Sequence, residues 1–147
     1  MSNILVVSIF GGLGSMAFAL LYHIKARHLF FAGLGGMLTT FVCLSVMELL
    51  DGHHIAANLI AAFVGGVYSA ICAYCRKAPS VLFLIPSLFV LVPGRSLYYS
   101  MMSFMHHNMD VFVSNIVTVV EISLGIAMGV MLSSMVGDVF FRRRSRL

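Results

Sequence analysis

Residues 78–98 read APSVLFLIPSLFVLVPGRSLY, and this stretch decides the fold. The run is apolar enough to enter a bilayer, but Pro86 and the step Pro93-Gly94-Arg95 interrupt it. A proline inside a helix removes one backbone hydrogen bond and clashes with the carbonyl group four residues earlier. In lipid, a broken helix persists only where protein or a water-filled cavity covers the unsatisfied backbone groups. The stretch therefore predicts a discontinuous membrane helix beside a solute pathway.

The composition is that of an integral membrane protein. Of the 147 residues, 61% are hydrophobic and 10% are charged, and the mean hydropathy is +1.03. Soluble domains contain about 25% charged residues, so a soluble fold of this chain would lack polar groups for its surface. The sequence contains no Gly-x-Ser-x-Gly, His-Glu-x-x-His or phosphate-binding glycine loop. An all-helical membrane domain is expected, with no enzymatic activity, no cofactor and no nucleic-acid partner.

A single transmembrane domain is predicted to cover residues 1–147. A helix needs about 20 apolar residues to cross the hydrocarbon core. No lysine or arginine precedes the first apolar run, so this run is predicted to be a retained helix rather than a signal peptide. The expected spans are residues 4–22, 30–50, 55–75, 80–105 (the broken one) and 112–138, with a basic tail at 139–147.

The basic residues predict the orientation, because lysines and arginines favour the cytoplasmic side. The first connection carries Lys25 and Arg27, and the third carries Arg76 and Lys77. Five spans bring these residues and the four arginines of the tail to one side, with the amino terminus outside and the carboxyl terminus in the cytoplasm. A four-span alternative, with 80–105 re-entrant, would leave the tail outside. We therefore expect a five-span protein of the bacterial inner or plasma membrane.

Small residues at four-residue spacing form three ridges, each along one face of a predicted span. Such ridges let membrane helices approach closely. They can pack within this chain or against a second subunit, and both alternatives stay open at this point. The ridges are Gly11, Ser15 and Ala19; Ala57, Ala61, Gly65, Ser69 and Ala73; and Gly125, Gly129, Ser133 and Gly137.

The helix break is the predicted binding site. Residues 80–92 are about half the length needed to cross, which places the Pro93-Gly94 step near mid-membrane. A helix restarting near Ser96 presents free N–H groups and the positive end of its dipole, which hold anionic groups in many transporters. Arg95 adds a permanent cation, and Tyr98 adds a neutral donor on the same turn. The candidate substrate-binding residues are Pro86, Pro93, Gly94, Arg95, Ser96 and Tyr98.

Two acidic residues within or near the spans are candidates for proton coupling. A desolvated carboxyl group at Glu48 or Glu121 can bind and release a proton. Each could equally lie at the headgroup level as a solvated charge. The alternative for Arg95 is a purely structural kink, at which Arg95 forms an ion pair with Glu48 or Glu121 or extends to a membrane interface.

Two other functions are alternatives to solute export. Residues 101–110, MMSFMHHNMD, combine methionine with histidine, and thioethers select Cu(I). His53 and His54, with Asp51, are expected on the same side of the membrane and could complete a site for a metal-ion transporter. Because the segment has no cysteine and no strict methionine repeat, no metal ligand is assigned. The other alternative is a non-transporting membrane scaffold that uses only the small-residue ridges.

Two segments resemble the threonine/serine exporter family. The first is Ala78 to Pro86 followed by Leu91-Val92-Pro93-Gly94 and Tyr98. The second is Leu21-Tyr22-His23-Ile24 with Arg27, followed by Ala32-Gly33-Leu34-Gly35-Gly36. The chain is similar to the small subunit of the split form, which corresponds to the carboxyl-terminal half of fused exporters. Arg95 departs from the family pattern, in which a small residue usually follows Pro-Gly.

The resemblance implies an exporter of small hydrophilic metabolites driven by the proton gradient. Threonine and serine are the expected substrates, with the dicarboxylate succinate as a further one. It also implies a larger membrane subunit as partner. From the residues alone, either an amino acid or a dicarboxylate supplies the carboxylate that the restarted helix would hold.

Overall fold

The computed structural model describes residues 2–24, 26–50 and 53–142, and within these residues all regular structure is helical. This confirms the predicted fold class. The helices are α1 (Ser2–Leu21), α2 (Ala26–Leu49), α3 (His54–Arg76), α4 (Val81–Phe89), α5 (Gly94–Met105) and α6 (Met109–Arg142).

Four helices, α1, α2, α3 and α6, are long and apolar enough to cross a membrane. The predicted broken span is present as α4 and α5, which meet at an angle of 48° across a four-residue break. The described residues thus provide four spans, or five when the bent pair counts as one.

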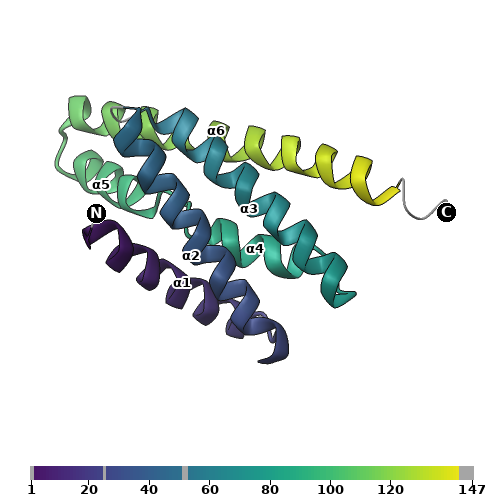
Figure 1. Ribbon diagram of the computed structural model, residues 1–147. Helices are drawn as coiled ribbons and strands as arrows, with labels where there is room; N and C mark the ends of the chain where they lie inside the picture. The colour runs from purple at the N-terminus through teal and green to yellow at the C-terminus, as the bar shows by residue number, and fades with distance from the viewer. Residues whose placement is uncertain (1, 25, 51–52, 143–147) are drawn as a thin grey trace.

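The four long helices lie side by side in the order α1, α2, α3, α6 (Figure 1). Helix α4 packs against α1, α2 and α3, whereas α5 packs mainly against α6. At the start of α4, Ser80 shares a cavity with Tyr74 from the last turn of α3. In α5, Arg95 shares another cavity with His54 from the first turn of α3. The bent pair therefore follows the length of α3, as a single broken span would.

The break is wider than the sequence predicted, and the reason is Pro93. Helix α4 ends at Phe89, the residue whose carbonyl group a helical Pro93 would clash with. Leu91 and Val92 instead donate to carbonyls three residues earlier, at 2.9 and 3.2 Å. Helix α5 then restarts at Gly94, two residues before the expected position near Ser96.

The small-residue ridges are used for packing inside the chain. A Cβ atom at Gly125 would lie 2.6 Å from the carbonyl oxygen of Ile55, so α6 approaches the backbone of α3 directly. A Cβ at Gly129 would lie 2.8 Å from the Cβ of Ala62, on the same pair of helices. Between α1 and α2, the side chain of Thr40 leaves no room for a Cβ at Gly11. Of the two alternatives, these contacts support packing within the chain.

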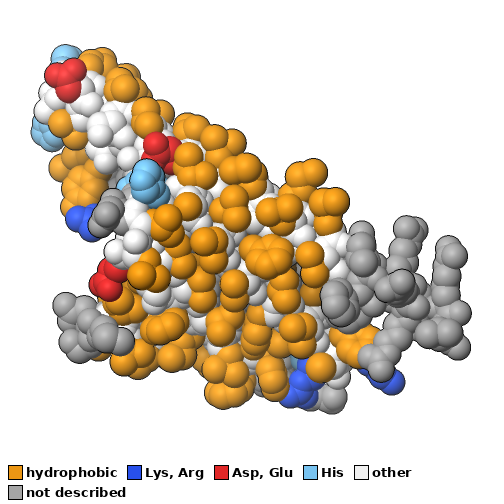
Figure 2. All heavy atoms as spheres, turned by 45° about the horizontal axis from the view of Figure 1, so that its top comes forward, with side chains coloured by type: hydrophobic (Ala, Val, Ile, Leu, Met, Phe, Trp, Pro, Cys, Tyr) orange, Lys and Arg blue, Asp and Glu red, His pale blue; other side chains and the backbone are white. Residues whose placement is uncertain are grey.

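Many large hydrophobic side chains are exposed on the described helices, as a lipid-facing protein requires. Figure 2 shows a broad hydrophobic face, with acidic side chains and histidines gathered toward one end of the molecule. Much of the basic charge on which the orientation prediction depends is not described by the structure. Lys25, Asp51 and residues 143–147 lie outside the described residues, and the side chains of Arg27 and Arg142 are not described.

Candidate functional site

A cavity of about 820 Å³ lies beside the helix break. This volume falls in the range of small-molecule binding pockets. Residues of α1, α2, α3, α5 and α6 line it, together with the four residues of the break itself. Its polar lining consists of Thr40, Cys43, His54, Asn58, Arg95, Ser96, Tyr99, Asn115 and Thr118.

The amino-terminal end of α5 opens on this cavity. Pro93 is the N-cap residue and makes no side-chain capping bond. The N–H of Gly94 donates to the carbonyl of Val92 at 2.8 Å, but in the described part of the chain the N–H groups of Arg95 and Ser96 have no backbone acceptor. Free N–H groups at the positive end of a helix dipole attract anions. The restart of the helix therefore supplies an anion-binding surface in the wall of the cavity.

Arg95 brings a full positive charge to the same wall. Its side chain is exposed to the cavity, and its guanidinium carbon lies 5.7 Å from the centroid of the Tyr99 ring, within the range of a cation–π contact. Among the described side chains, no ion pair joins Arg95 to Glu48 or Glu121. In the described part of the chain, neither glutamate therefore neutralises the Arg95 charge at the cavity wall.

Two asparagines give the cavity neutral acceptors. Asn58 is buried, and its Nδ2 donates to the carbonyl of His54 at 2.8 Å, while its Oδ1 accepts only the weak S–H of Cys43 at 3.7 Å. The Nδ2 of Asn115 likewise donates to the carbonyl of Val111 at 2.8 Å. Each amide uses one of its two N–H donors within its own helix, and its oxygen has a lone pair with which to accept a hydrogen bond from a ligand.

Hydroxyl groups of threonine add two further acceptors by the same arrangement. Thr40 donates to the carbonyl of Gly36 at 2.8 Å, and Thr118 donates to that of Ser114 at 3.1 Å. Sequence reasoning missed these residues and the two asparagines. A polar amide in an otherwise apolar span, as at Asn58, indicates a candidate site residue. Whether that amide reaches the cavity depends on which face of the helix is turned toward the break.

The structure brings together four of the predicted substrate-binding residues, Pro93, Gly94, Arg95 and Ser96, in the lining of the cavity. The other two lie elsewhere. Tyr98 is 62% exposed and does not line the cavity, where its neighbour Tyr99 takes the corresponding place. Pro86 is buried within α4, and its carbonyl accepts a hydrogen bond from the Ser15 hydroxyl at 2.9 Å, so its place is in helix packing.

The two candidate proton carriers do not line this cavity. Glu48 is exposed and borders a separate groove of about 440 Å³ between the first residues of α1 and the last turns of α2. Glu121 is half-buried on α6, next to Ile122, which does line the cavity.

The methionine- and histidine-containing segment lies at the end of α5 and in the turn before α6. Met101, Met102 and Met105 are exposed there. Within the described residues, no three or more side chains of histidine, cysteine, aspartate or glutamate gather as a metal site would require. Cys72 and Cys75 are free thiols, one buried and one exposed.

Comparison with known proteins gives one match. A family model described as "Threonine/Serine exporter, ThrE" matches residues 7–136. This range includes most of α1, both halves of the broken span and most of α6. Searches of curated proteins and of solved structures found no match.

Proposed function

The chain belongs to the threonine/serine exporter family, whose members are membrane transporters and not enzymes, and we propose that it is one membrane subunit of a proton-coupled exporter of small carboxylate-bearing metabolites. The observation that carries the proposal is the cavity of about 820 Å³ into which α5 begins, with Arg95 in its wall.

The substrate carboxylate binds at the start of α5. The N–H groups of Arg95 and Ser96 and the Arg95 guanidinium supply several donors around one position. Hydrogen bonds to a charged group are stronger than those between neutral groups. Because the cation and the helix dipole act on the same anion, this end of the cavity holds the carboxylate.

Threonine and serine fit the remaining lining better than succinate does. An amino acid carries an ammonium group, which donates hydrogen bonds. The acceptors available to it are the amide oxygens of Asn58 and Asn115 and the hydroxyl oxygens of Thr40 and Thr118. Succinate needs a second cation instead, and Arg95 is the one arginine or lysine among the described lining residues. The amino acids are therefore the primary substrates of the proposal.

A larger membrane subunit of the same family completes the transporter. Helix α5 packs mainly on α6, and most of its surface is exposed in this chain, including Leu97, Met101 and Phe104. Apolar side chains on this surface suit either lipid or a neighbouring helix. Alternating access then results from the two subunits rocking about the broken span.

Proton coupling is assigned to Glu121, with Glu48 as the second candidate. Glu121 is half-buried on α6 and directly precedes Ile122, which lines the cavity, whereas Glu48 is exposed beside a different groove. In the proposed orientation the amino terminus lies outside, the tail is cytoplasmic, and the cavity at the break belongs to the outer half of the inner or plasma membrane.

The test is threonine efflux from liposomes that contain this chain and its larger partner. Arg95→Ala removes charged hydrogen bonds worth about 1.5–3 kcal/mol, so the rate at low substrate should fall roughly tenfold or more. Arg95→Lys keeps the charge and should recover part of the rate. Arg76→Ala is the matched control, because it removes a basic side chain that stacks on Phe31 and does not line the cavity.

Two outcomes would contradict this proposal. Efflux at the wild-type rate by the folded Arg95→Ala protein would show that the substrate carboxylate does not bind at Arg95. Robust threonine transport by this chain alone in liposomes would remove the requirement for a second subunit.

A further inference from the structure

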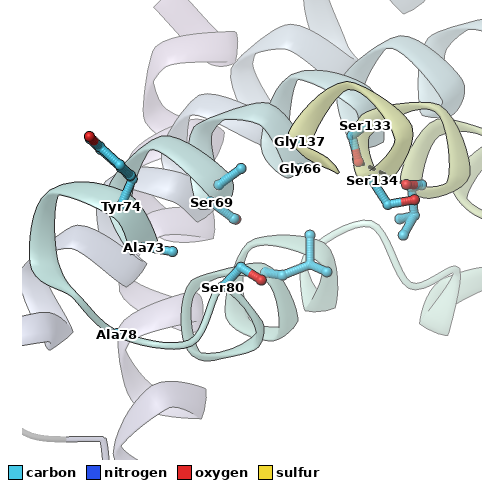
Figure 3. Close-up of a pocket in the computed structure, with 12 residues that line it drawn as sticks. Gly66, Ser69, Ala73, Tyr74, Ala78, Ser80, Ser133, Ser134 and Gly137 are labelled. Atoms are coloured by element: carbon cyan, nitrogen blue, oxygen red, sulfur yellow. Dashed lines mark hydrogen bonds between the residues drawn. The ribbon is translucent and has the colours of Figure 1, made fainter. Parts of the chain in front are cut away.

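A second cavity, of about 390 Å³, lies beside the start of α4, near the other end of α3 from the first cavity. Its walls come from the last turns of α3, the first turn of α4 and the last described turns of α6. Figure 3 shows side chains from these three helices around one space, with Ser69, Ser80 and Ser133 on different helices. None of the described residues that line it is charged at neutral pH.

Serine hydroxyls give this cavity its polarity. Ser69 donates to the carbonyl of Gly65 at 2.8 Å, and Ser133 donates to that of Val130 at 2.9 Å. Ser134 donates to the carbonyl of Met131 at 2.8 Å. Each of these three hydroxyl groups donates its hydrogen to a carbonyl of its own helix, and its oxygen can still accept a hydrogen bond. They can therefore accept hydrogen bonds from the ammonium or hydroxyl group of an amino acid.

The start of α4 supplies the complementary donors. Ser80 occupies the N-cap position but makes no side-chain capping bond, so its hydroxyl is free to donate to a ligand. Within the described chain the N–H of Val81 has no backbone acceptor. The two halves of the broken span are thus alike, since α4 begins at the second cavity and α5 begins at the first.

The two cavities are separated by one layer of packed side chains. On α3, the facing lining residues are Gly66 of the second cavity and Asn58 of the first. On α6, they are Val130 of the second cavity and Ile122 of the first. Both pairs are eight residues apart, which at 1.5 Å per residue gives about 12 Å. The layer between them contains Ala62 and Leu91, both buried, with Leu88, Ile126 and Val130 packed around them.

The side chains of Ala62, Leu88, Leu91, Ile126 and Val130 in this layer are apolar and offer no hydrogen bond to a charged solute. A zwitterion cannot cross the layer without losing its hydrogen bonds, which is unfavourable in an apolar medium. An exporter nevertheless has to bind its substrate first from the cytoplasmic side. A cavity with serine hydroxyls on that side of the layer supplies such a binding position.

We propose that the serine-lined cavity is a second substrate subsite, which takes a free hydroxy amino acid from the cytoplasm before it passes to the cavity beside Arg95. This inference rests on the proposed export function and orientation. The start of α4 and the Ser80 hydroxyl bind the carboxylate, and the hydroxyl oxygens of Ser69, Ser133 and Ser134 bind the ammonium and hydroxyl groups. The layer around Leu88 and Leu91 is the barrier that opens between the two subsites.

The first experiment measures threonine affinity from each side, using counterflow in vesicles of defined orientation that contain the complete exporter. The quadruple variant Ser69→Ala, Ser80→Ala, Ser133→Ala and Ser134→Ala removes four hydroxyl groups and keeps every Cβ. The KM for threonine on the cytoplasmic side should rise at least fivefold, with the KM on the outer side unchanged. Arg95→Ala should raise the outer KM more than the cytoplasmic one.

The second experiment fills the cavity. Ser134 has an exposed side chain at the cavity, so Ser134→Phe can be accommodated without disturbing the helix contacts. It should block efflux. Ser123→Phe is the matched control, because Ser123 is an exposed serine on the same helix, bonds to its own backbone in the same way and lines neither cavity.

The outcomes separate the two proposals. Unchanged cytoplasmic KM in the quadruple variant, together with normal efflux by the folded Ser134→Phe protein, would mean that the cavity holds lipid or a partner helix and would overturn the second subsite. The export proposal would then still stand if Arg95→Ala impairs transport. If the serine variants act as expected and Arg95→Ala has no effect, the assignment at the break is wrong and the subsite stands alone.

Discussion

The two halves of the broken span differ sharply in how they are held. Helix α4 contacts three neighbouring helices, and its residues Phe83, Pro86 and Ser87 are buried. Helix α5 is longer, but it has one buried residue, Ser100, and packs mainly on α6. The difference indicates that α4 is a fixed part of the helix bundle, whereas displacement of α5 disturbs few contacts.

This contrast indicates that the two halves of the span have different roles. The anchored half fixes the position of the break, and the weakly packed half carries Arg95 and Ser96 in the cavity wall. A transporter needs both properties, since its site has to be placed accurately and yet opened during the cycle. The following predictions test whether the body of α4 anchors the span in the bundle and whether the start of α5 carries the site at the break.

The largest effect is expected where α4 meets α2. At Gly35 a Cβ atom would run into the hydroxyl of Ser87 and lie 3.0 Å from the Tyr68 ring, so Gly35→Ala should destabilise the protein by about 1–3 kcal/mol. The thermal midpoint in detergent is the measurement. Gly14→Ala is the control, because a Cβ there meets nothing within 4 Å and should leave the midpoint unchanged or raised. Equal midpoints for the two variants would contradict tight packing at α4.

Removal of the proline at the break should spare stability and stop transport. Pro93→Ala restores an N–H and relieves the clash that ends α4 at Phe89, so the helix can continue through residues 90–93. The start of α5 then loses its free N–H groups, and threonine efflux should fall roughly tenfold or more, in line with lost charged hydrogen bonds.

Pro79→Ala is the control for this variant, because Pro79 precedes α4, where a proline interrupts no helical hydrogen bond. It should transport normally. Full activity of Pro93→Ala would show that the break is structural only.

Glu121→Gln should uncouple efflux from the proton gradient. The amide keeps the size of the side chain and cannot exchange a proton. Efflux should no longer respond to an imposed pH difference, while exchange of threonine for threonine continues. Glu48→Gln is the comparison, and it should change the response less because Glu48 is exposed and borders a different groove. A normal pH response in both variants would reject proton coupling through either residue.

The two adjacent tyrosines of α5 should differ by a smaller amount. Tyr99 lines the cavity and lies under the Arg95 guanidinium, whereas Tyr98 is exposed outside it. Cation–π contacts are worth about 0.5–1 kcal/mol at exposed sites, so Tyr99→Leu should raise the KM about two- to fivefold. Tyr98→Leu should leave the KM within experimental error, and a larger effect at Tyr98 would reverse the assignment.

The smallest effect is expected at the end of α5. The triple variant Met105→Ala, His106→Ala and His107→Ala should leave threonine efflux unchanged, because none of the three lines either cavity. The same variant tests the metal-transport alternative, since loss of metal tolerance with normal threonine efflux would give this segment a separate role.

The sequence predicted the helical membrane fold and the break, and its physical basis is local. Hydropathy over about 20 residues identifies a span without any knowledge of its neighbours. The covalent ring of Pro93 interrupts a helix in any environment. The same reasoning placed Arg95 and Ser96 at the start of a helix, and the structure puts both in the lining of the cavity.

Reasoning from the sequence was less successful wherever the face of a helix matters. Tyr98 and Tyr99 are adjacent and chemically identical, yet the rotation of α5 brings only Tyr99 to the cavity. Asn58 on α3 and Asn115 on α6 are 57 residues apart in the chain, and the packing of α3 along α6 brings them to one cavity.

The amino-acid sequence by itself determined that this chain is a bundle of membrane helices and that one of them is interrupted, because both properties follow from the hydropathy and covalent geometry of short segments. Only the tertiary structure decided where the cavities lie and which polar groups face them. The physical reason is that close approach at Gly35, Gly125 and Gly129 sets how each helix is rotated against the next. That rotation, and not the residue type alone, selects the hydroxyl and amide groups available to a substrate.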